Sequence, residues 1–216
     1  MKLIFIIIAV AYLLLFLVRW LLSLIYYKKG KSDVTDFPEN LFTVVQPILS
    51  GDPRLESDLR ANLQQTKTVE FYWLIDQSDT EAQRVANKIC QDELFSQRIR
   101  IFLIEDVPQG INPKSYKIEQ VVEDLTRPYL IVLDDDSVID FSKMGELTAY
   151  LGQEVILTGI PYNQERSNFW SKLVAAFVNG NSLITYFTMA QVEANHSING
   201  MFYILPVNLV KDQDLF

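Results

Sequence analysis

The N-terminus carries the longest apolar stretch of the chain. Residues 3–18 are all apolar, Arg19 interrupts them, and residues 20–27 are apolar apart from one serine. A helix of this length reaches roughly 37 Å, enough to cross a hydrocarbon core of about 30 Å. Three lysines follow the stretch closely and one precedes it. The pattern predicts a transmembrane anchor over residues 1–27, with the rest of the chain in the cytoplasm by the positive-inside rule.

Two alternatives concern this stretch. Arg19 can snorkel toward the cytoplasmic face or pair with a partner helix. A cleaved signal peptide is the rival interpretation, but its apolar region would be too long and no A-x-A-like cleavage site follows. We therefore expect an uncleaved, single-pass anchor, then a polar linker over residues 28–40, then one domain over residues 41–216.

Beyond the linker, short apolar runs alternate with stretches of helical period. The runs have the length of buried strands. They are residues 42–46, 70–75, 99–104, 129–133, 155–159 and 201–205. The helical stretches are residues 54–65, 80–94, 114–125, 142–151 and 168–190. Pro53 and Thr80 are expected to start two helices, as an N1 and an N-cap residue. The alternation predicts an α/β fold with a mostly parallel sheet and flanking helices.

Charge and composition exclude several classes of protein. The formal net charge is −8, and the N-terminal anchor is basic, so the domain after it is more acidic still. Because phosphate binding needs a basic face, no nucleic-acid partner is expected. A chain with 49% hydrophobic and 21% charged residues is not disordered. Its single cysteine, Cys90, excludes an intramolecular disulfide and suits a reducing compartment.

An acidic run follows one predicted strand. Asp134, Asp135 and Asp136 come directly after residues 129–133. Ligands of parallel sheets bind outside the carboxyl ends of the strands, and Mg²⁺ or Mn²⁺ prefers such hard oxygen ligands. If the strand continued, Asp134 and Asp136 would point to the same side and could share one ion and a diphosphate. The alternative is a solvated acidic turn or a helix N-cap.

A second strand end carries Asp76 and Asp79. A carboxylate there can accept hydrogen bonds from a base N–H or from ribose hydroxyls. Asp79 or Ser78 could instead only cap the helix that begins near Thr80.

The loop before a third helix contains Gly110, Asn112, Pro113 and Lys114. Glycine and asparagine allow a tight turn, proline fixes φ, and the lysine places a point charge near the strand ends. The loop could meet a phosphate or be an ordinary turn.

Other candidates favour structural roles. Residues 158–162 could line a sugar or acceptor pocket, although a turn is the simpler interpretation. Cys90 is expected to be inert, and His196 is more often structural than a base. The aromatic-rich residues 169–187 are typical of a core helix or of a membrane-facing one.

The order of these motifs resembles family-2-type glycosyltransferases of the GT-A fold. The motifs are QPILSGDP, IDQSD, GINPK, LIVLDDDS, TGIPYN and NGMFYIL. Within that group the chain is most similar to the ceramide glucosyltransferases and their bacterial relatives, which carry the GINPK loop ahead of a D-x-D-type strand. The resemblance covers residues 42–210, and it implies a Rossmann-like, mixed but mostly parallel sheet.

The resemblance implies an inverting transfer of glucose, or another hexose, from a UDP-sugar to the hydroxyl of a lipid such as ceramide. Asp76 or Asp79 would hold the uridine. Asp134 and Asp136 would bind Mg²⁺ or Mn²⁺, which neutralises the departing diphosphate. Asp135 is a second candidate for the family's conserved aspartate.

The GINPK loop would complete this donor pocket. The resemblance implies that Gly110, Asn112 and Lys114 line the part that holds the nucleotide diphosphate.

Members of that family also carry a later acidic motif with the general base, a (Q/R)-x-x-R-W motif and further membrane segments. This sequence ends at Phe216, before any of these. We therefore expect residues 41–216 to be the donor-binding part of a longer enzyme, completed by further sequence or a second chain. The alternatives are a non-catalytic membrane protein that binds a nucleotide-sugar, and a dolichyl-phosphate or polysaccharide-synthase-like transferase.

Overall fold

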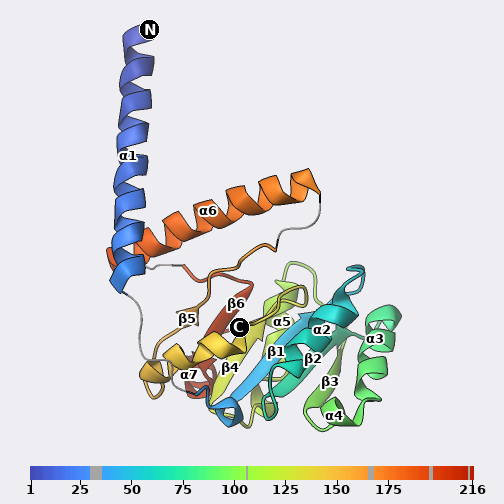
Figure 1. The fold of residues 1–216 in the computed structure, drawn as a ribbon. Coiled ribbons are helices and arrows are strands. Elements are labelled where there is room, and N and C mark those ends of the chain that lie inside the picture. The colour runs from blue at the N-terminus through green and yellow to red at the C-terminus, as the bar shows by residue number, and fades with distance from the viewer. Residues whose placement is uncertain (30–35, 106, 165–167, 195–196, 214) are drawn as a thin grey trace. The chain divides into compact units, whose positions relative to one another are not determined.

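The computed structural model describes residues 1–29, 36–105, 107–164, 168–194, 197–213 and 215–216. The chain divides into two compact units. One unit, Met1–Ser32 with Gly159–Asn199, contains two long helices, and the other, Asp33–Thr158 with Gly200–Phe216, contains the sheet (Figure 1).

The sheet has six strands in the order β3-β2-β1-β4-β6-β5. They are β1 Phe42–Ile48, β2 Glu70–Asp76, β3 Ile99–Ile104, β4 Tyr129–Leu133, β5 Leu157–Thr158 and β6 Phe202–Pro206. The first four strands pair in parallel, whereas β6 runs antiparallel to β4 and to β5. The predicted α/β fold with a mixed, mostly parallel sheet is confirmed, although β5 is shorter than the predicted run 155–159.

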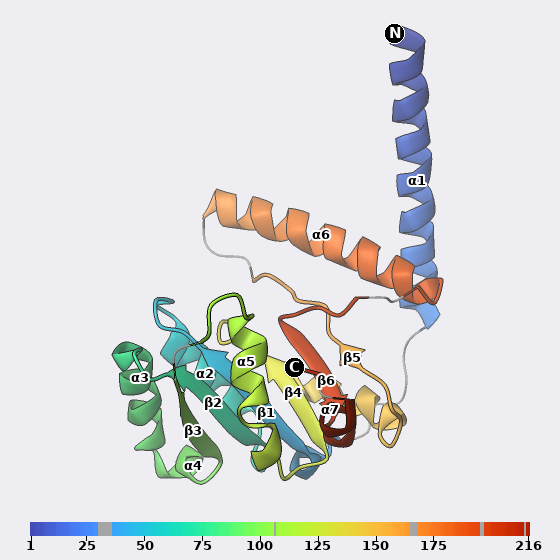
Figure 2. The ribbon, with the colours of Figure 1, turned by 180° about the vertical axis from the view of Figure 1, so that it is seen from behind.

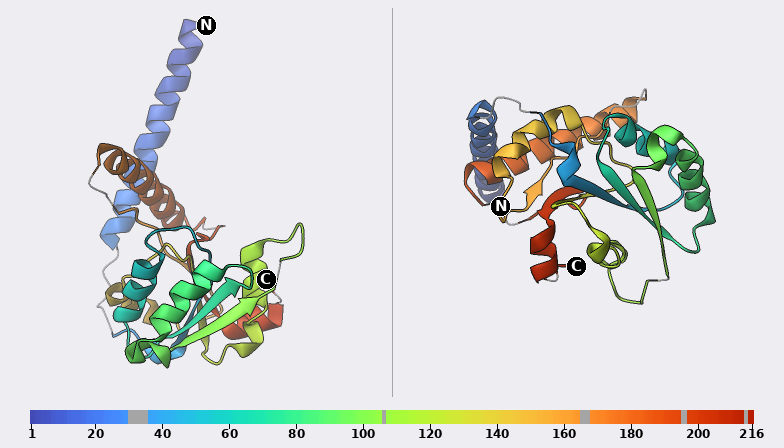
Figure 3. Two further views of the ribbon diagram at one scale, coloured as in Figure 1. Left: turned by 90° about the vertical axis from the view of Figure 1, so that its right-hand side faces the viewer. Right: turned by 90° about the horizontal axis from the view of Figure 1, so that it is seen from below.

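Helices cover both faces of this sheet (Figures 2 and 3). The helices against one face are α2 Leu55–Gln64, α3 Thr80–Cys90, α4 Glu93–Ser96 and the 3₁₀ helix η3 Phe141–Tyr150. Those against the other are α5 Pro113–Glu119, the 3₁₀ turn η2 Val122–Asp124 and α7 Val207–Gln213. A further 3₁₀ turn, η1 Glu39–Leu41, precedes β1. Because both faces are covered, the strands are apolar along almost their whole length, as the sequence indicated.

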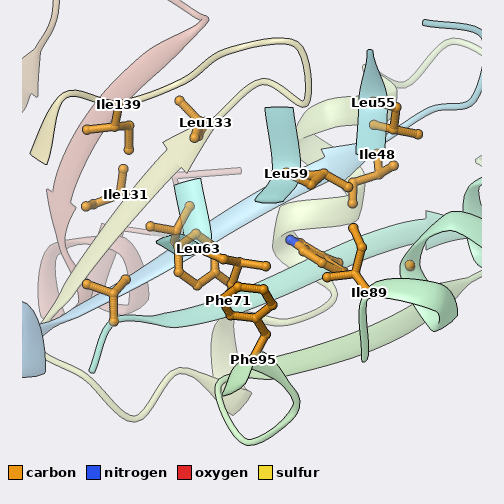
Figure 4. Close-up of a cluster of buried hydrophobic side chains, with 14 of the residues drawn as sticks. Ile48, Leu55, Leu59, Leu63, Phe71, Ile89, Phe95, Ile131, Leu133 and Ile139 are labelled. Carbon is orange, nitrogen blue, oxygen red and sulfur yellow. The ribbon is translucent and has the colours of Figure 1, made fainter. Parts of the chain in front are cut away.

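Successive strand residues enter the two cores in turn. Phe71 and Trp73 of β2 lie in the core beneath α2 and α3, together with Leu59 and Ile89 from those helices (Figure 4). Tyr72 of β2 lies in the opposite core, against α5. The indole N–H of Trp73 donates to the buried Oε1 of Gln46, 3.1 Å away, which satisfies a polar group inside the first core.

Short polar side chains decide where several helices begin. Asp79, not Thr80, is the N-cap of α3, since its carboxylate accepts a hydrogen bond from the N–H of Ala82. Asp92 caps α4 in the same way, so the predicted helix over residues 80–94 is split in two. Pro53 is not an N1 residue, because α2 begins at Leu55.

The other unit contains α1 Lys2–Lys29 and α6 Phe169–Gln191. Among the described residues, these two helices are long and apolar enough to cross a membrane. The sequence predicted one such helix, and α1 runs two residues into the stretch expected as a linker. Arg19 pairs with a helix of its own chain, because its guanidinium donates to Thr185 Oγ1 of α6 at 2.8 Å.

Candidate active site

The carboxyl ends of three adjacent strands carry most of the predicted site residues. β1 lies between β2 and β4, and all three run parallel. Asp76 ends β2, and the acidic run follows β4. The backbone that leaves β1 at Leu49 and Ser50 therefore lies between the two groups of carboxylates.

The acidic run forms a turn. β4 ends at Leu133, and the N–H of Ser137 donates to the carbonyl of Asp134 at 3.2 Å. The expectation that Asp134 and Asp136 point to the same side of a continuing strand is wrong, because the ladder stops before the turn. Asp136 is exposed, whereas Asp134 and Asp135 are partly buried.

Asp135 is directed toward the end of β1. Its Oδ2 accepts a hydrogen bond of 2.7 Å from the N–H of Leu49. Burial raises the pKa of Asp135, the charges of Asp136 and Asp134 raise it further, and the hydrogen bond from Leu49 opposes both. The turn thus concentrates negative charge that a cation would relieve.

The ammonium of Lys114 lies beside this negatively charged turn. It forms an ion pair with Asp134 and donates to the carbonyl of Gly200. The same nitrogen lies 5.9 Å from the centre of the Tyr203 ring, within the range of a cation–π contact. Burial, reinforced by the charge of Asp134, raises the pKa of Tyr203 to about 12, so its hydroxyl stays protonated.

The GINPK loop aims Lys114. Gly110 has φ 89° in a turn closed by a 3.3 Å hydrogen bond from the N–H of Ile111 to the carbonyl of Pro108. Asn112 caps α5 by accepting from the N–H of Lys114 at 2.9 Å, and Pro113 occupies the first helical position. The loop therefore starts α5, and the first turn of that helix directs Lys114 toward the carboxyl ends of the strands.

A second lysine of α5, which the sequence analysis missed, meets Asp76. Lys117 Nζ lies 2.8 Å from Asp76 Oδ1, and the lysine side chain is only 6% exposed. That oxygen is buried and receives no well-aligned hydrogen bond, so the contact is an ion pair. The i, i+3 spacing from Lys114 was the available signal, since it places both lysines on neighbouring positions of one helix surface.

Both carboxylate oxygens of Asp79 accept hydrogen bonds from the backbone. One carboxylate oxygen accepts from the N–H of Ala82 at 2.9 Å, and the other accepts from the N–H of Ser50 at 2.8 Å. Burial favours a higher value, but these hydrogen bonds outweigh it and lower the pKa of Asp79 below its ordinary value. Asp79 and Asp135 therefore hold two successive N–H groups after β1 from opposite sides.

Asn62 of α2 is another residue that the sequence analysis missed. It is fully buried and donates to the carbonyl of Ser137 at 2.9 Å, and its own Oδ1 accepts from the N–H of Ile139 at 2.9 Å. It fixes the segment that leaves the acidic turn.

The carboxylates of the acidic turn are suitable ligands for a hard divalent cation. Carboxylate oxygens are the ligands that Mg²⁺ and Mn²⁺ prefer. Within the part of the chain that the structure describes, no group of three or more acidic, histidine or cysteine side chains is arranged to hold a metal. A cation at the turn would therefore need oxygens from water or a ligand beside those of Asp134 and Asp136.

The remaining candidates are Cys90, residues 158–162 and His196. Cys90 ends α3, and burial raises the pKa of its thiol, as expected for an inert cysteine. Thr158 belongs to β5, where its hydroxyl donates to the carbonyl of Phe202 at 3.1 Å. Residues 159–162 belong to the other unit. His196 lies outside the described residues.

Two solved structures share this fold at low sequence identity. A mannosyltransferase from Pyrobaculum calidifontis, in complex with GDP-Man and Mn²⁺, superposes with a TM-score of 0.57 at 12% identity, covering 91% of this chain and 55% of its own. TarS of S. aureus, residues 1–349, superposes with a TM-score of 0.50 at 13% identity, covering 81% of this chain and 49% of its own. The chain thus spans about half the length of these proteins.

Sequence comparison identifies the family. The profile of glycosyl transferase family 21 matches residues 1–212. The chain belongs to that family. No curated protein sequence matches it significantly.

Proposed function

We propose that this chain is the donor-binding part of a membrane-anchored glycosyltransferase, which transfers glucose or another hexose from a UDP-sugar to a lipid hydroxyl such as that of ceramide, with inversion. The observation that carries the proposal is the placement of Lys114 against the acidic turn, where a sugar diphosphate and a cation would meet. Membership of glycosyl transferase family 21 supports the reaction class.

Asp76 is the candidate for contact with the uridine. Asp79 has both oxygens engaged by backbone N–H groups, whereas Asp76 forms an ion pair with Lys117 and stays 25% exposed. The lysine would orient Asp76, so that its oxygens accept hydrogen bonds from the donor.

The diphosphate would lie beside Lys114 and the acidic turn. Asp134 and Asp136 would hold Mg²⁺ or Mn²⁺, and Asp135, tied to Leu49, would keep the turn in place. The cation would neutralise charge on the departing nucleoside diphosphate. Lys114, with Gly110 and Asn112 shaping its loop, would stabilise the same phosphate oxygens.

The membrane would bring the lipid acceptor to the enzyme. α1 is long enough to span a bilayer, and the lysines at its C-terminal end favour a cytoplasmic sheet unit. The general base that accepts the acceptor's proton is not assigned among these residues.

Calorimetric titration of the full chain in lipid nanodiscs tests the donor site. We expect UDP-glucose to bind only with Mn²⁺ or Mg²⁺, and Asp134→Asn to abolish that binding. Asp140→Asn is the matched control, because Asp140 is exposed and pairs with Lys143 at 2.9 Å instead of with the site. Binding that ignores the metal and survives Asp134→Asn would contradict the proposal, and tighter binding of GDP-mannose would overturn the assigned nucleotide.

Turnover separates an enzyme from a binding protein. Transfer of labelled glucose to ceramide in the same nanodiscs, or metal-dependent hydrolysis of UDP-glucose, is expected once the acceptor side is complete. Metal-dependent binding with neither reaction in a polypeptide that extends beyond Phe216 would favour the non-catalytic alternative.

A further inference from the structure

One face of α6 is apolar and open. Its first half exposes five large apolar side chains, each at least 50% accessible, at helical spacing. These residues, here called the α6 stripe, are Phe169, Trp170, Leu173, Val174 and Phe177. Monomeric soluble proteins rarely expose such a continuous apolar strip, so we expect the α6 stripe to contact another apolar surface.

The opposite face of α6 is fixed inside its own unit. Asn179 is buried, and its amide donates to the carbonyl of Asn163 at 3.0 Å and accepts from the N–H of Asn163 at 2.8 Å. Ala175, one turn earlier, is buried as well. The helix therefore cannot rotate to hide its stripe without breaking both hydrogen bonds.

Contacts with α1 are confined to one end of α1. Arg19 donates to Thr185, and Thr188 donates to the carbonyl of Arg19 at 2.9 Å. The rings of Tyr26 and Phe187 are tilted by 40° to each other, with 5.2 Å between their centres. Figures 1 and 2 show the two helices meeting at the C-terminal end of α1 and diverging from there. A second span beside α1 would follow it along its length instead.

That end of α1 has the features of a membrane–water boundary. Trp20, Tyr26 and Tyr27 form the kind of aromatic belt found at bilayer interfaces, and Lys28 and Lys29 follow at the helix end. The single charged residue of α6 is also basic, Lys172, and it lies off the stripe. Basic residues beside an apolar helix face suit the surface of an anionic leaflet.

We propose that α6 is an in-plane membrane helix, which lies in the interface beside the anchor α1 with the α6 stripe immersed in the acyl boundary. The occupant of the stripe is therefore the lipid surface itself. Polar residues at Asn179, Thr185 and Thr188 face protein, so they do not oppose this immersion. The inference shares with the proposed function only the assumption that α1 spans the membrane, and it needs no sugar transfer.

Nitroxide depth measurements on the full chain in phosphatidylcholine–phosphatidylglycerol nanodiscs test it. Single cysteines replace Trp170, Leu173, Phe177 or Lys172 in a Cys90→Ser background, and each label's access to oxygen and to a water-soluble nickel complex reports its depth. We expect the three stripe labels at one shallow depth and the Lys172→Cys label in water. The stripe positions are exposed, so the fold should persist, which thermal unfolding of each variant checks.

Three other results would overturn the inference. A depth that changes steadily from residue 170 to 177, by about 10 Å at 1.5 Å per residue, would make α6 a second span. Free access of the nickel complex to all labels would leave the stripe in water. Immobilised labels shielded from both reagents would indicate a protein partner.

A label at Leu13→Cys on α1 separates the two proposals. A deep Leu13 label with stripe labels in water would refute the in-plane helix and leave the anchor standing. A Leu13 label in water would refute the anchor, and the in-plane helix with it.

Discussion

Lys117 Nζ lies 2.8 Å from Oδ1 of Asp76, and the lysine belongs to the same helix as Lys114, which pairs with Asp134. One short helix, α5, therefore places two ammonium groups against carboxylates at the ends of β2 and β4, the strands on either side of β1. The arrangement balances the negative charge at these strand ends.

Removing the buried ammonium tests that balance. Lys117→Met keeps the length of the side chain but leaves Asp76 without its cation. Breaking a fully buried pair costs about 3–5 kcal/mol. Asp76 retains 25% exposure, so we expect a smaller loss of unfolding free energy, about 2 kcal/mol. Chemical unfolding of the detergent-solubilised chain measures it.

A double mutant and a control variant help to interpret the stability loss of Lys117→Met. Adding Asp76→Asn to Lys117→Met should recover part of the stability, because no uncompensated charge then remains. Lys88→Met is the matched control, since Lys88 pairs with Glu56 at 2.7 Å while 54% exposed, and its loss should cost about 1 kcal/mol or less. Equal losses of unfolding free energy in Lys117→Met and Lys88→Met would show that the Lys117–Asp76 pair stabilises the fold no more than an exposed pair.

Lys114→Gln should weaken phosphate recognition selectively. A hydrogen bond to a charged group contributes about 1.5–3 kcal/mol, so affinity for UDP should fall roughly 10- to 100-fold. Uridine lacks the diphosphate and should bind the variant as it binds the wild type. Calorimetry with both ligands makes the comparison, and a parallel loss for uridine would place Lys114 elsewhere in the pocket.

Asn62→Leu should release the segment after the acidic turn. The leucine is of similar size but leaves the carbonyl of Ser137 and the N–H of Ile139 without their buried partner. Each such group costs about 1–3 kcal/mol, so unfolding free energy should fall by at least ~2 kcal/mol, and metal-dependent UDP binding should weaken. Gln64→Leu, on the exposed side of the same helix, is the control. An unchanged unfolding midpoint for Asn62→Leu would show that Asn62 does not hold the segment after the acidic turn.

Asp79→Asn separates the charge of the helix cap from its hydrogen bonds. The pKa of Asp79 is lower in the folded protein than in the unfolded chain, so its ionised form stabilises the fold above about pH 4. This contribution disappears as pH falls through the lowered folded value. The wild type should therefore exceed Asp79→Asn in melting temperature at pH 7, and the gap should close toward pH 3. Asp79→Ala should lose a further ~1 kcal/mol at both values. A gap independent of pH would contradict the assignment.

Gly110→Ala should strain the loop that aims Lys114. Gly110 has φ 89°, and an added Cβ would meet no atom within 4 Å, so the cost is purely conformational. We expect a loss of about 1–2 kcal/mol in unfolding free energy and weaker UDP binding. Gly110→Asn should be milder, because asparagine tolerates positive φ better than alanine. Equal effects of the two variants would exclude backbone strain as the cause.

The sequence by itself determined the elements of this protein. The run 129–133 matches β4, because a strand buried on both faces must be apolar throughout. The strand-end carboxylates and the GINPK loop were also visible, because polar groups after apolar runs stand out. The order of the motifs indicated the glycosyltransferase class that family membership supports.

Tertiary structure decided what those residues do. Asp134 and Asp136 do not share a strand face, because the chain turns at the end of the ladder to reach residue 137. The roles of Lys117 and Asn62 depend on partners 41 and 75 residues away, which only the strand order β3-β2-β1-β4 brings close. Local sequence specifies hydrogen bonds within a turn or helix, whereas pairing across a sheet follows from the packing of the whole core.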